Sequence, residues 1–352
     1  ILEKGGSVIL MSHLGRPKEG PTNKYSLKHI VSTVAKNIGT DVLFADDCIG
    51  TDAYEKSAAL KPGQVLLLEN LRFYKEEEKG DVAFAEKLSK HGDIYVNDAF
   101  GTAHRAHAST AVIAQFFKDD AKCFGYVMAG EVASINKVIN GAEAPFTAIV
   151  GGAKVSDKIL IIEQLMNKAN NILIGGGMAF TFVKAMGGTI GKSLCEDDKL
   201  DLAKELLAKA KAKGVNLYIP TDAIVADNFA NDAAKKDSKI NAIEEGWMGL
   251  DISNETIGTY ADVIKNSKTI LWNGPMGVFE MSSFENGTKQ VALAIAEATK
   301  KGAYTLIGGG DSVAAINKYN LAEQVSYVST GGGALLEYIE QGSLPGVRAI
   351  EG

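Results

Sequence analysis

The side chains best suited to hold a small anion occupy few places in this chain. It has only four arginines, and three of them, Arg16, Arg72 and Arg105, lie near the ends of expected strands. Three of the five histidines accompany them: His13, His104 and His107. A guanidinium is a rigid fork of N–H donors that binds carboxylates and phosphates with two hydrogen bonds. The pattern predicts an anion pocket in the first half of the chain, although any single arginine could instead pair with a surface carboxylate.

Glycine clusters recur in the second half, each between an expected strand and an expected helix. There are four of them: Gly151-Gly152, Gly175-Gly176-Gly177, Gly308-Gly309-Gly310 and Gly331-Gly332-Gly333. Ligands bind beyond the carboxyl ends of parallel strands, where the free backbone N–H groups of helix N-termini attract phosphate. One cluster can serve a tight turn alone. Four at the same edge of a sheet predict a nucleotide-binding domain.

Charged residues beside these clusters extend the prediction. Lys154 and Lys158 flank the first helix of the second half, and both could reach one phosphate chain. Asp311 follows a triple glycine and could cap a helix there. Because Mg²⁺ takes one or two carboxylates together with phosphate oxygens, we favour the role of a magnesium ligand for it. The loop from Asn273 to Glu280 reaches the same edge and is expected to hold the ribose and phosphates.

Two known phosphate-binding fingerprints do not fit. The dinucleotide pattern GxGxxG needs a final glycine, and the triple clusters have Phe180, Val313 or Leu336 there. The stretch Thr189–Ser193 is similar to the end of a Walker A loop, but Met186 replaces its first glycine. An oxidoreductase that uses a dinucleotide is therefore disfavoured. Since the histidines accompany arginines and not a candidate nucleophile, we expect direct phosphoryl transfer without a covalent intermediate.

These residues need elements to position them, and short β-type runs alternate with amphipathic helical stretches along the chain, as in α/β proteins. A length of 352 residues exceeds what one hydrophobic core usually serves, so we expect two domains. Each is expected to be doubly wound around a parallel sheet in a Rossmann-like arrangement. The expected strands are Val8–Ser12, Val42–Ala45, Val65–Asn70, Ile94–Ala99, Phe146–Val150, Asn171–Ile174, Leu217–Ile219, Thr269–Trp272, Tyr304–Ile307 and Val325–Ser329.

The expected boundary between the domains lies near the middle of the chain. A helical stretch over residues 126–140 leads into a turn at Gly141–Pro145, so the first domain covers 1–125 and the second covers 141–333. At the start, Ile1–Lys4 followed by two glycines resembles the last turn of a helix whose beginning is missing. We therefore expect a segment upstream of Ile1.

Composition excludes several classes of function. The net charge of -6 and the pI near 5.5 lack the basic field that nucleic acid or an anionic membrane requires. No apolar run is long enough to span a bilayer, and no secretory segment opens the chain, so we expect a cytoplasmic protein and a monomer. The three cysteines, Cys48, Cys123 and Cys195, are odd in number and widely spaced, which argues against disulfides and zinc.

Eight motifs together resemble one family, the phosphoglycerate kinases. They are SHLGRP at 12–17, ENLRF at 69–73, DAFGTAHRAH at 98–107, GGAKVSDK at 151–158, GGGMAFTF at 175–182, LWNGPMGVFE at 271–280, GGGDS at 308–312 and STGGGA at 329–334. The resemblance implies reversible transfer of a phosphoryl group between ATP and 3-phosphoglycerate, giving ADP and 1,3-bisphosphoglycerate, with Mg²⁺. It also implies two domains that face a central cleft and close around the substrates, and a tail, residues 334–352, that returns to the first domain.

The resemblance also implies roles for individual residues. The triose anion would be held by His13, Arg16, Arg72, His104 and Arg105. The groups that act on the transferring phosphoryl group would be Arg16, Arg105, Lys154, Gly310 and Gly333. The nucleotide would be held by Gly152, Ala153, Lys154, Lys158, Gly175, Gly176, Gly177, Gly249, Asn273, Pro275, Gly277, Val278, Glu280, Gly309, Gly310, Asp311 and Ser312. Among these, Asp311 would be the Mg²⁺ ligand.

One part of the family's pattern has no counterpart here. The family begins with a strand that carries an Arg-Val-Asp-Phe-Asn type motif and a following arginine, which supply further triose ligands, and nothing in this chain matches it. The chain thus lacks the family's N-terminal segment. An alternative stays open for this reason, namely a catalytically impaired nucleotide-binding fragment or relative. Turnover of the substrates distinguishes the two.

Overall fold

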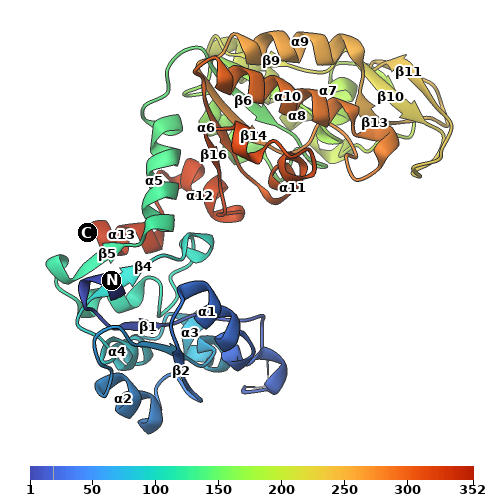
Figure 1. Ribbon diagram of the computed structural model, residues 1–352. Helices are drawn as coiled ribbons and strands as arrows, with labels where there is room; N and C mark the ends of the chain where they lie inside the picture. The colour runs from blue at the N-terminus through green and yellow to red at the C-terminus, as the bar shows by residue number, and fades with distance from the viewer. Residues whose placement is uncertain (19) are drawn as a thin grey trace. The chain divides into compact units, whose positions relative to one another are not determined.

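The computed structural model describes residues 1–18 and 20–352 and forms two compact units (Figure 1). The first unit contains Ile1–Ala129 and Ser343–Gly352, and the second contains Gly130–Gly342. Helix α5 (Tyr126–Ile139) contributes residues to both units. Strands and helices alternate in each unit, which agrees with the predicted α/β class.

The first unit is built on short parallel strands. The central strand β3 (Val65–Leu68) pairs with β1 (Val8–Leu10) on one side and with β2 (Val42–Ala45) on the other. A second pair consists of β4 (Tyr95–Asn97) and β5 (Lys122–Phe124). All four residues of β3 are buried, as expected of a continuous apolar run in a strand covered on both faces.

Short helices complete the first unit. They are α1 (Val31–Ile38), α2 (Thr51–Ala58), α3 (Lys75–Lys79), α4 (Val82–Ser89) and α13 (Pro345–Glu351). Asp81 caps α4 by accepting a hydrogen bond from Phe84 N at 2.8 Å, and Phe84 and Leu88 then face the core. Gly346 N donates to Ala103 O at 2.8 Å, which fastens the C-terminal helix to the loop after β4.

A six-stranded parallel sheet forms the centre of the second unit, in the order β16-β15-β14-β6-β7-β9. Its strands are β6 (Phe146–Val150), β7 (Asn171–Ile174), β9 (Asn216–Tyr218), β14 (Thr269–Asn273), β15 (Tyr304–Ile307) and β16 (Tyr327–Val328). Every residue of β6, β7 and β14 is buried. Because all six strands run in one direction, their carboxyl ends and the glycine clusters that follow lie at one edge, as predicted.

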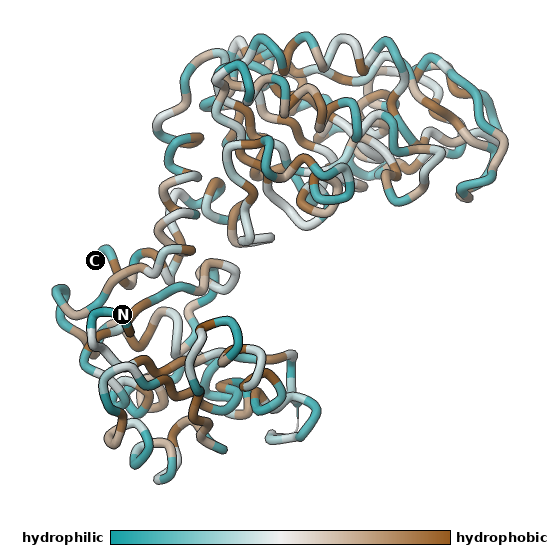
Figure 2. Tube along the Cα trace, viewed as in Figure 1, coloured by the Kyte–Doolittle hydropathy of each residue, from teal (hydrophilic) through white to brown (hydrophobic). Residues whose placement is uncertain are grey.

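Helices surround this sheet. They are α6 (Ile159–Leu165), α7 (Met178–Ala185), α8 (Leu200–Ala212), α9 (Asn254–Lys265), α10 (Asn286–Lys300), α11 (Gly310–Lys318) and α12 (Gly333–Gln341). Helices α9 and α10 lie side by side (Figure 1). Trp272 of β14 is fully buried in one core with Tyr260 of α9 and Ile295 of α10. Figure 2 shows the hydrophobic residues concentrated along the strands and hydrophilic residues on outer turns.

A part of the second unit differs from the predicted doubly wound sheet. Strand β10 (Asp222–Ala226) pairs in antiparallel fashion with β11 (Lys235–Lys239) and β13 (Met248–Ile252). Strand β12 (Ala242–Ile243) pairs with β8 (Thr189–Ile190). The sequence KKDSK of β11 has no apolar residue, so periodicity cannot reveal it, and its three lysines are typical of an exposed edge strand.

The chain returns to the first unit later than the sequence predicts. Helix α12 belongs to the second unit, and the first unit resumes at Ser343 and not directly after Gly333. Packing explains the difference, because Leu335 of α12 is fully buried and fills the space beside Gly308, where a Cβ would overlap it. Among the described residues, no helix has both the length and the apolar character needed to cross a membrane.

Candidate active site

The predicted anion-binding residues of the first unit stand on three loops that follow strands. His13 and Arg16 follow β1, Arg72 follows β3, and His104 and Arg105 follow β4. His13, Arg16 and Arg105 are exposed, whereas Arg72 and His104 are half-buried. Arg105 Nε donates to His104 Nε2 at 3.2 Å. Three strand ends thus present cationic side chains, as the sequence predicts.

Arg72 joins two of these loops. Its Nη1 donates to Gly15 O at 2.9 Å, and its Nε lies 3.5 Å from Glu78 Oε1. Asn70 supports the arrangement, since its Oδ1 accepts from Arg72 N at 3.0 Å and its Nδ2 donates to Leu14 O at 2.8 Å. The loop after β1 is therefore tied to the loop after β3 by side-chain to backbone bonds.

The pKa directions indicate that these cations lie near one another. His13 is exposed as a residue, but partial burial of its imidazole and then the charge of Arg72 lower its pKa. Burial, Arg72 and also Arg105 lower the pKa of His107. Burial lowers the pKa of Arg72, and Arg105 and Arg16 lower it further. The structure therefore gathers these groups around Arg72, together with His107, which is 5% exposed and which accompanies the arginines in the sequence without a predicted role.

Buried carboxylates hold the loops of the first unit in place. Glu69 accepts from Ser26 Oγ at 2.5 Å and from Leu27 N at 2.7 Å. Glu77 accepts from Ser109 N at 3.1 Å and from the hydroxyl of the same serine. Burial raises the pKa of Glu77, against the two bonds from Ser109, which lower it. In both cases one carboxylate binds a serine hydroxyl and a backbone N–H, which fixes the path of a loop.

In the second unit, the loops at the strand ends pack backbone against backbone. A Cβ on Gly151 would overlap the carbonyl oxygens of Gly274 and Pro275, and a Cβ on Gly176 would overlap Gly152. Gly152, Gly176 and Gly274 have φ values of 140°, 70° and 102°, which residues with a side chain rarely adopt. These glycines allow the ends of β6, β7 and β14 to meet.

Polar side chains connect the same loops. Lys158 Nζ donates to Asn273 Oδ1 at 2.6 Å, and Asn273 Nδ2 donates to Gly308 O at 2.8 Å. Gly274 N donates to Ser312 Oγ at 2.5 Å. Asn273 is 1% exposed and Ser312 is fully buried. Both side chains therefore brace the loops from within, and direct contact of the Ser312 hydroxyl with a ligand is not available in this arrangement.

Other predicted groups at this edge face solvent. Lys154, Gly310, Asp311 and Gly333 are exposed, and the two glycines are the first residues of α11 and α12. The N–H groups of a first helical turn have no acceptor within the helix, so they can bind an anion. Burial lowers the pKa of Lys158, and the charge of Asp311 raises it. The Lys158 ammonium and the Asp311 carboxylate are thus close enough to interact.

The oxygen ligands available at this edge of the sheet determine whether Mg²⁺ can bind there. Among residues 1–18 and 20–352, no group of three or more His, Cys, Asp or Glu side chains is arranged to hold a metal. A single exposed carboxylate such as Asp311, beside loops suited to phosphate, fits Mg²⁺, which keeps several waters and takes its other oxygens from phosphates. These residues are compatible with a metal that arrives with a nucleotide.

The remaining predicted residues lie around β13 and on the loops after β6, β7, β14 and β15. Gly249 N donates to Ser193 Oγ at 2.8 Å, and a Cβ on Gly249 would overlap the ring of Phe180. Val278 N donates to Leu250 O at 2.9 Å and so attaches the 273–280 loop to β13. On the strand-end loops themselves lie Ala153, Gly175, Gly177, Pro275, Gly277, Glu280 and Gly309.

Asp251 lies beneath the 273–280 loop. Its carboxylate is buried and accepts from Ile252 N at 2.9 Å and from Gly287 N at 2.7 Å, in the first turn of α10. A Cβ on Gly277 would overlap this carboxylate. Burial raises the pKa of Asp251 to about 7, against the two backbone hydrogen bonds, which lower it. A titratable group thus supports a loop predicted to bind the nucleotide.

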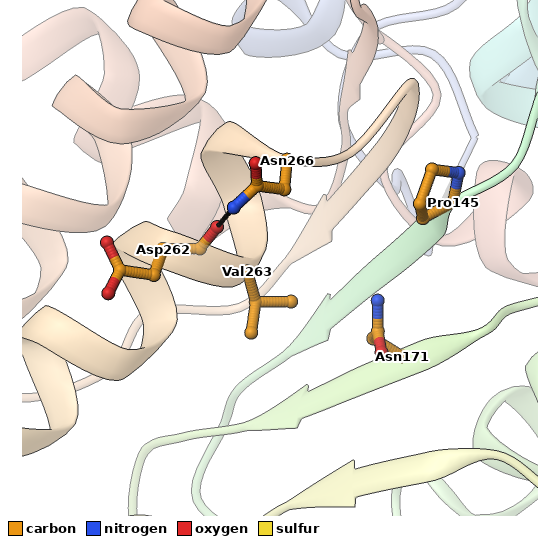
Figure 3. A pocket seen from close by; sticks show the side chains of 5 residues that line it. All are labelled: Pro145, Asn171, Asp262, Val263 and Asn266. Atoms are coloured by element: carbon orange, nitrogen blue, oxygen red, sulfur yellow. Dashed lines mark hydrogen bonds between the residues drawn. The ribbon is translucent and has the colours of Figure 1, made fainter.

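A pocket in the second unit lies at the opposite edge of the sheet (Figure 3). Its lining consists of Pro145, Asn171, Asp262, Val263 and Asn266. Pro145 directly precedes β6 and Asn171 begins β7, so the pocket adjoins the amino ends of these strands. None of the predicted site residues lines it.

The fold and its two sets of loops define a class of protein. One unit gathers arginines and histidines suited to a small anion, and the other presents glycine-rich loops, helix N-termini and lysines suited to a nucleotide, as in a nucleotide-dependent phosphotransferase. Sequence comparison then gives the family, because the family profile described as Phosphoglycerate kinase matches residues 1–342. The chain belongs to the phosphoglycerate kinase family.

Individual relatives agree with this assignment. A phosphoglycerate kinase of Porphyromonas gingivalis is 54% identical, over 100% of this chain and 90% of the relative. A cytosolic phosphoglycerate kinase of Triticum aestivum is 53% identical, over 100% of this chain and 87% of the relative. The structure of phosphoglycerate kinase from Coxiella burnetii is 41% identical, has a TM-score of 0.92 and covers 99% of this chain and 87% of that one. The predicted family, fold class and enzyme class are confirmed, and the impaired relative is not favoured.

Sequence reasoning missed the residues that hold the site residues in position. They are Glu69, Asn70, Glu77, His107, Asp251 and the pair Ser156 and Glu196 described below. For Asn70 and His107 a signal was present, since they belong to the motifs that carry Arg72 and Arg105. The same holds for Glu69, which shares a motif with Arg72, but for Glu77, Asp251 and Glu196 no local pattern exists, because partners such as Ser109, Gly287 and Ser156 lie far away in the sequence.

Proposed function

We propose that this chain transfers a phosphoryl group reversibly between ATP and 3-phosphoglycerate, with the nucleotide held by the second unit and the triose by the first. The observation that carries the proposal is the edge of the six-stranded sheet, where five strand ends present glycine turns, Lys154, Lys158 and Asp311. Membership of the phosphoglycerate kinase family supports the substrate and the place of the reaction in glycolysis and gluconeogenesis.

The triose would be bound by the cationic loops of the first unit. The guanidinium groups of Arg16 and Arg105 and the imidazole of His13 are exposed and can meet carboxylate and phosphate oxygens. Arg72 is held by Gly15 O and Glu78, so its orientation is set before the ligand arrives. Such preorganisation lowers the entropy lost when the anion binds. His104, which accepts from Arg105, would support this patch.

Transfer itself would be direct. Phosphoryl transfer requires aligned oxygens and neutralised charge and no covalent nucleophile. Lys154 is exposed and, within the described parts of the chain, its ammonium makes no hydrogen bond or ion pair, so it is available to the transferring group. We propose that Lys154, Arg16, Arg105 and the first N–H groups of α11 and α12, at Gly310 and Gly333, stabilise the charge that develops on the phosphoryl oxygens.

Magnesium would be held by Asp311 together with the nucleotide phosphates. Its chemistry is to neutralise phosphate charge and to orient the oxygens. Lys158, linked to Asn273, would bind phosphate beside it, and the 273–280 loop and the glycines at 175–177 and 249 would border the nucleotide. Domain closure, a monomeric state and a cytoplasmic location stay predictions.

A coupled assay with ATP and 3-phosphoglycerate tests the proposal. We expect turnover by the wild-type chain, and a loss of about 10²–10³ in kcat for Lys154→Ala with ADP affinity nearly unchanged, because the charge is matched to the transition state. Lys211→Ala removes an exposed lysine of α8 and serves as the control. ADP binding without any wild-type turnover would favour the impaired relative, and equal losses of binding and turnover in Lys154→Ala would reassign that lysine.

A further inference from the structure

The loop that carries Lys154 is held by a carboxylate from a distant part of the second unit. Glu196 Oε1 accepts from Ser156 Oγ at 2.5 Å, and Glu196 Oε2 accepts from Ser156 N at 3.0 Å. The two residues are 40 positions apart in the sequence. Ser156 lies two residues after Lys154 and two before Lys158, so both contacts act on the segment between the two lysines.

The other contacts of this segment hold its ends and its middle, and none of them, in the part of the chain that the structure describes, is made by Ser156. Residues 151–158 contain no helix or strand, and α6 begins only at Ile159. Val155 is fully buried, and Met178 N donates to Gly152 O at 3.0 Å, which fix the middle and the start of the loop. The backbone N–H of Ser156 has its acceptor in Glu196, and not in another part of its own loop. The two bonds from Glu196, together with the bond from Lys158 N to Val155 O at 3.0 Å, therefore fix the path of the chain after Lys154.

Glu196 is itself attached to the core of the unit. Its backbone N donates to Thr181 Oγ1 at 3.1 Å, and Thr181 is 1% exposed within α7. Burial raises the pKa of Glu196, but the hydrogen bonds from Ser156 and the charge of Lys154 lower it, and the net direction is down. The ionised form is thus the form that the loop favours. The same arrangement, a glutamate that binds a serine hydroxyl and a backbone N–H, holds the Ser109 loop through Glu77.

We propose that Glu196 is a positioning residue for phosphoryl transfer, which acts through its two hydrogen bonds to Ser156 to hold Lys154 where its ammonium meets the transferring group. The inference rests on the proposed role of Lys154. Glu196 is half-exposed and, among the described residues, makes no hydrogen bond to a residue of the predicted nucleotide site. Lys158 is held separately by Asn273, so removal of the Glu196 carboxylate should leave nucleotide binding intact. A displacement of about 1 Å in a reacting group can cost roughly 100-fold in rate.

The variants separate geometry from charge. Glu196→Ala removes both acceptors, and Ser156→Ala removes the hydroxyl bond alone. Glu196→Gln loses the charge, yet its amide oxygen can accept from Ser156 N while its NH₂ donates to Ser156 Oγ, so it can preserve the position of the loop. Asp198→Asn is the matched control, because Asp198 is a nearby exposed carboxylate that pairs with Lys199 at 2.9 Å and does not touch Ser156.

The experiment measures kcat at saturating ATP and 3-phosphoglycerate, and ADP affinity by calorimetry, for each variant. Each variant is made both in the wild-type chain and in the Lys154→Ala chain. We expect Glu196→Ala to lower kcat by roughly 10- to 100-fold, with ADP affinity within about threefold of wild type. We expect Ser156→Ala to lower kcat less than Glu196→Ala does. We expect the kcat of Glu196→Gln and of Asp198→Asn to stay within about threefold of the wild-type value. In the Lys154→Ala background, Glu196→Ala should have no further effect, because the group it positions is absent.

Different results overturn different statements. Wild-type kcat in Glu196→Ala, or an equal loss with and without Lys154, would overturn the positioning role. Equal losses in Glu196→Gln and Glu196→Ala would also overturn it and assign the effect to charge. If Lys154→Ala alone retained full turnover, the proposed role of Lys154 would fail first. Unchanged tryptophan fluorescence and ADP affinity in Glu196→Ala verify that the second unit is folded.

Discussion

The buried carboxyl group of Asp251 allows a quantitative test of how the second unit depends on pH. The perturbation is Asp251→Asn, which removes the ionisable group but retains its shape. Burial raises the pKa of Asp251 from its ordinary value of 3.8 to about 7. The unfolded chain therefore releases this proton at lower pH than the folded unit does. Consequently, ionisation of this group stabilises the unfolded state and makes the wild-type protein less stable as pH rises from about 4 to about 7.

The magnitude follows from the two values. Their difference is 7 − 3.8, or about 3 pH units, and each unit corresponds to about 1.4 kcal/mol. The full loss is therefore about 4 kcal/mol above pH 7, of which about 2–3 kcal/mol falls between pH 5 and pH 8. Asp251→Asn has no such proton. We expect its free energy of unfolding, minus that of the wild type, to increase by about 2–3 kcal/mol over the same range.

Tryptophan fluorescence during urea unfolding measures this difference. The chain has two tryptophans, Trp247 and Trp272, and both lie in the second unit, so the signal reports the unit that contains Asp251. Urea curves at pH 5, 6, 7 and 8 give the free energy of unfolding for each protein. Asp198→Asn is the control, because the Lys199 partner lowers the pKa of that exposed carboxyl, so any trend should have the opposite sign. Parallel pH dependence of the wild type and Asp251→Asn would refute the reasoning.

Three further predictions concern the two sets of loops. Asp311→Ala should weaken binding of Mg-ADP more than binding of ADP without metal, and calorimetry with and without Mg²⁺ shows whether it does. An equal effect would contradict the role of metal ligand and leave Asp311 as an acidic residue in the first turn of α11. Arg72→Lys should raise the KM for 3-phosphoglycerate by roughly tenfold, because a lysine ammonium cannot donate to Gly15 O and to a ligand at the same time as the forked guanidinium can. A KM equal to that of the wild type in steady-state assays would contradict this. Gly151→Ala should separate the loops after β6 and β14 and weaken ADP binding by roughly tenfold or more. If calorimetry shows an unchanged ADP affinity, the close contact between these two loops is not the reason why position 151 is glycine.

Local patterns in the sequence were sufficient for much of this fold. The buried strands of the six-stranded sheet have continuous apolar runs, and each glycine cluster follows such a run, so strand, turn and helix could be predicted in order. The anion residues could be predicted because arginine is rare here and three of the four stand at strand ends. In each case the information lies within a few residues of the position concerned.

Tertiary structure decided the features that depend on distant partners. The antiparallel strands β10, β11 and β13 have no apolar signal that marks all three, and α12 joins the second unit through packing against distant residues, among them Leu335 against Gly308. Ser312 was predicted to hold the nucleotide, but its hydroxyl accepts from Gly274 N because the folded loops bring the two together. A short-range pattern cannot contain such a contact, since nothing near Ser312 in the sequence specifies it.

The same reason explains why the sequence did not reveal the roles of three glutamates. Glu69 and Ser26 are 43 residues apart, Glu77 and Ser109 are 32 apart, and Glu196 and Ser156 are 40 apart. Glutamate is mostly a surface residue, so a sequence alone assigns these positions to solvent. Only the packing of the chain places each carboxylate beside a serine hydroxyl and a backbone N–H; Glu69 and Glu77 are buried there, and Glu196 is half-exposed. The sequence by itself determined which residues are proposed to carry the charge for phosphoryl transfer, and the tertiary structure decided which contacts hold them in place.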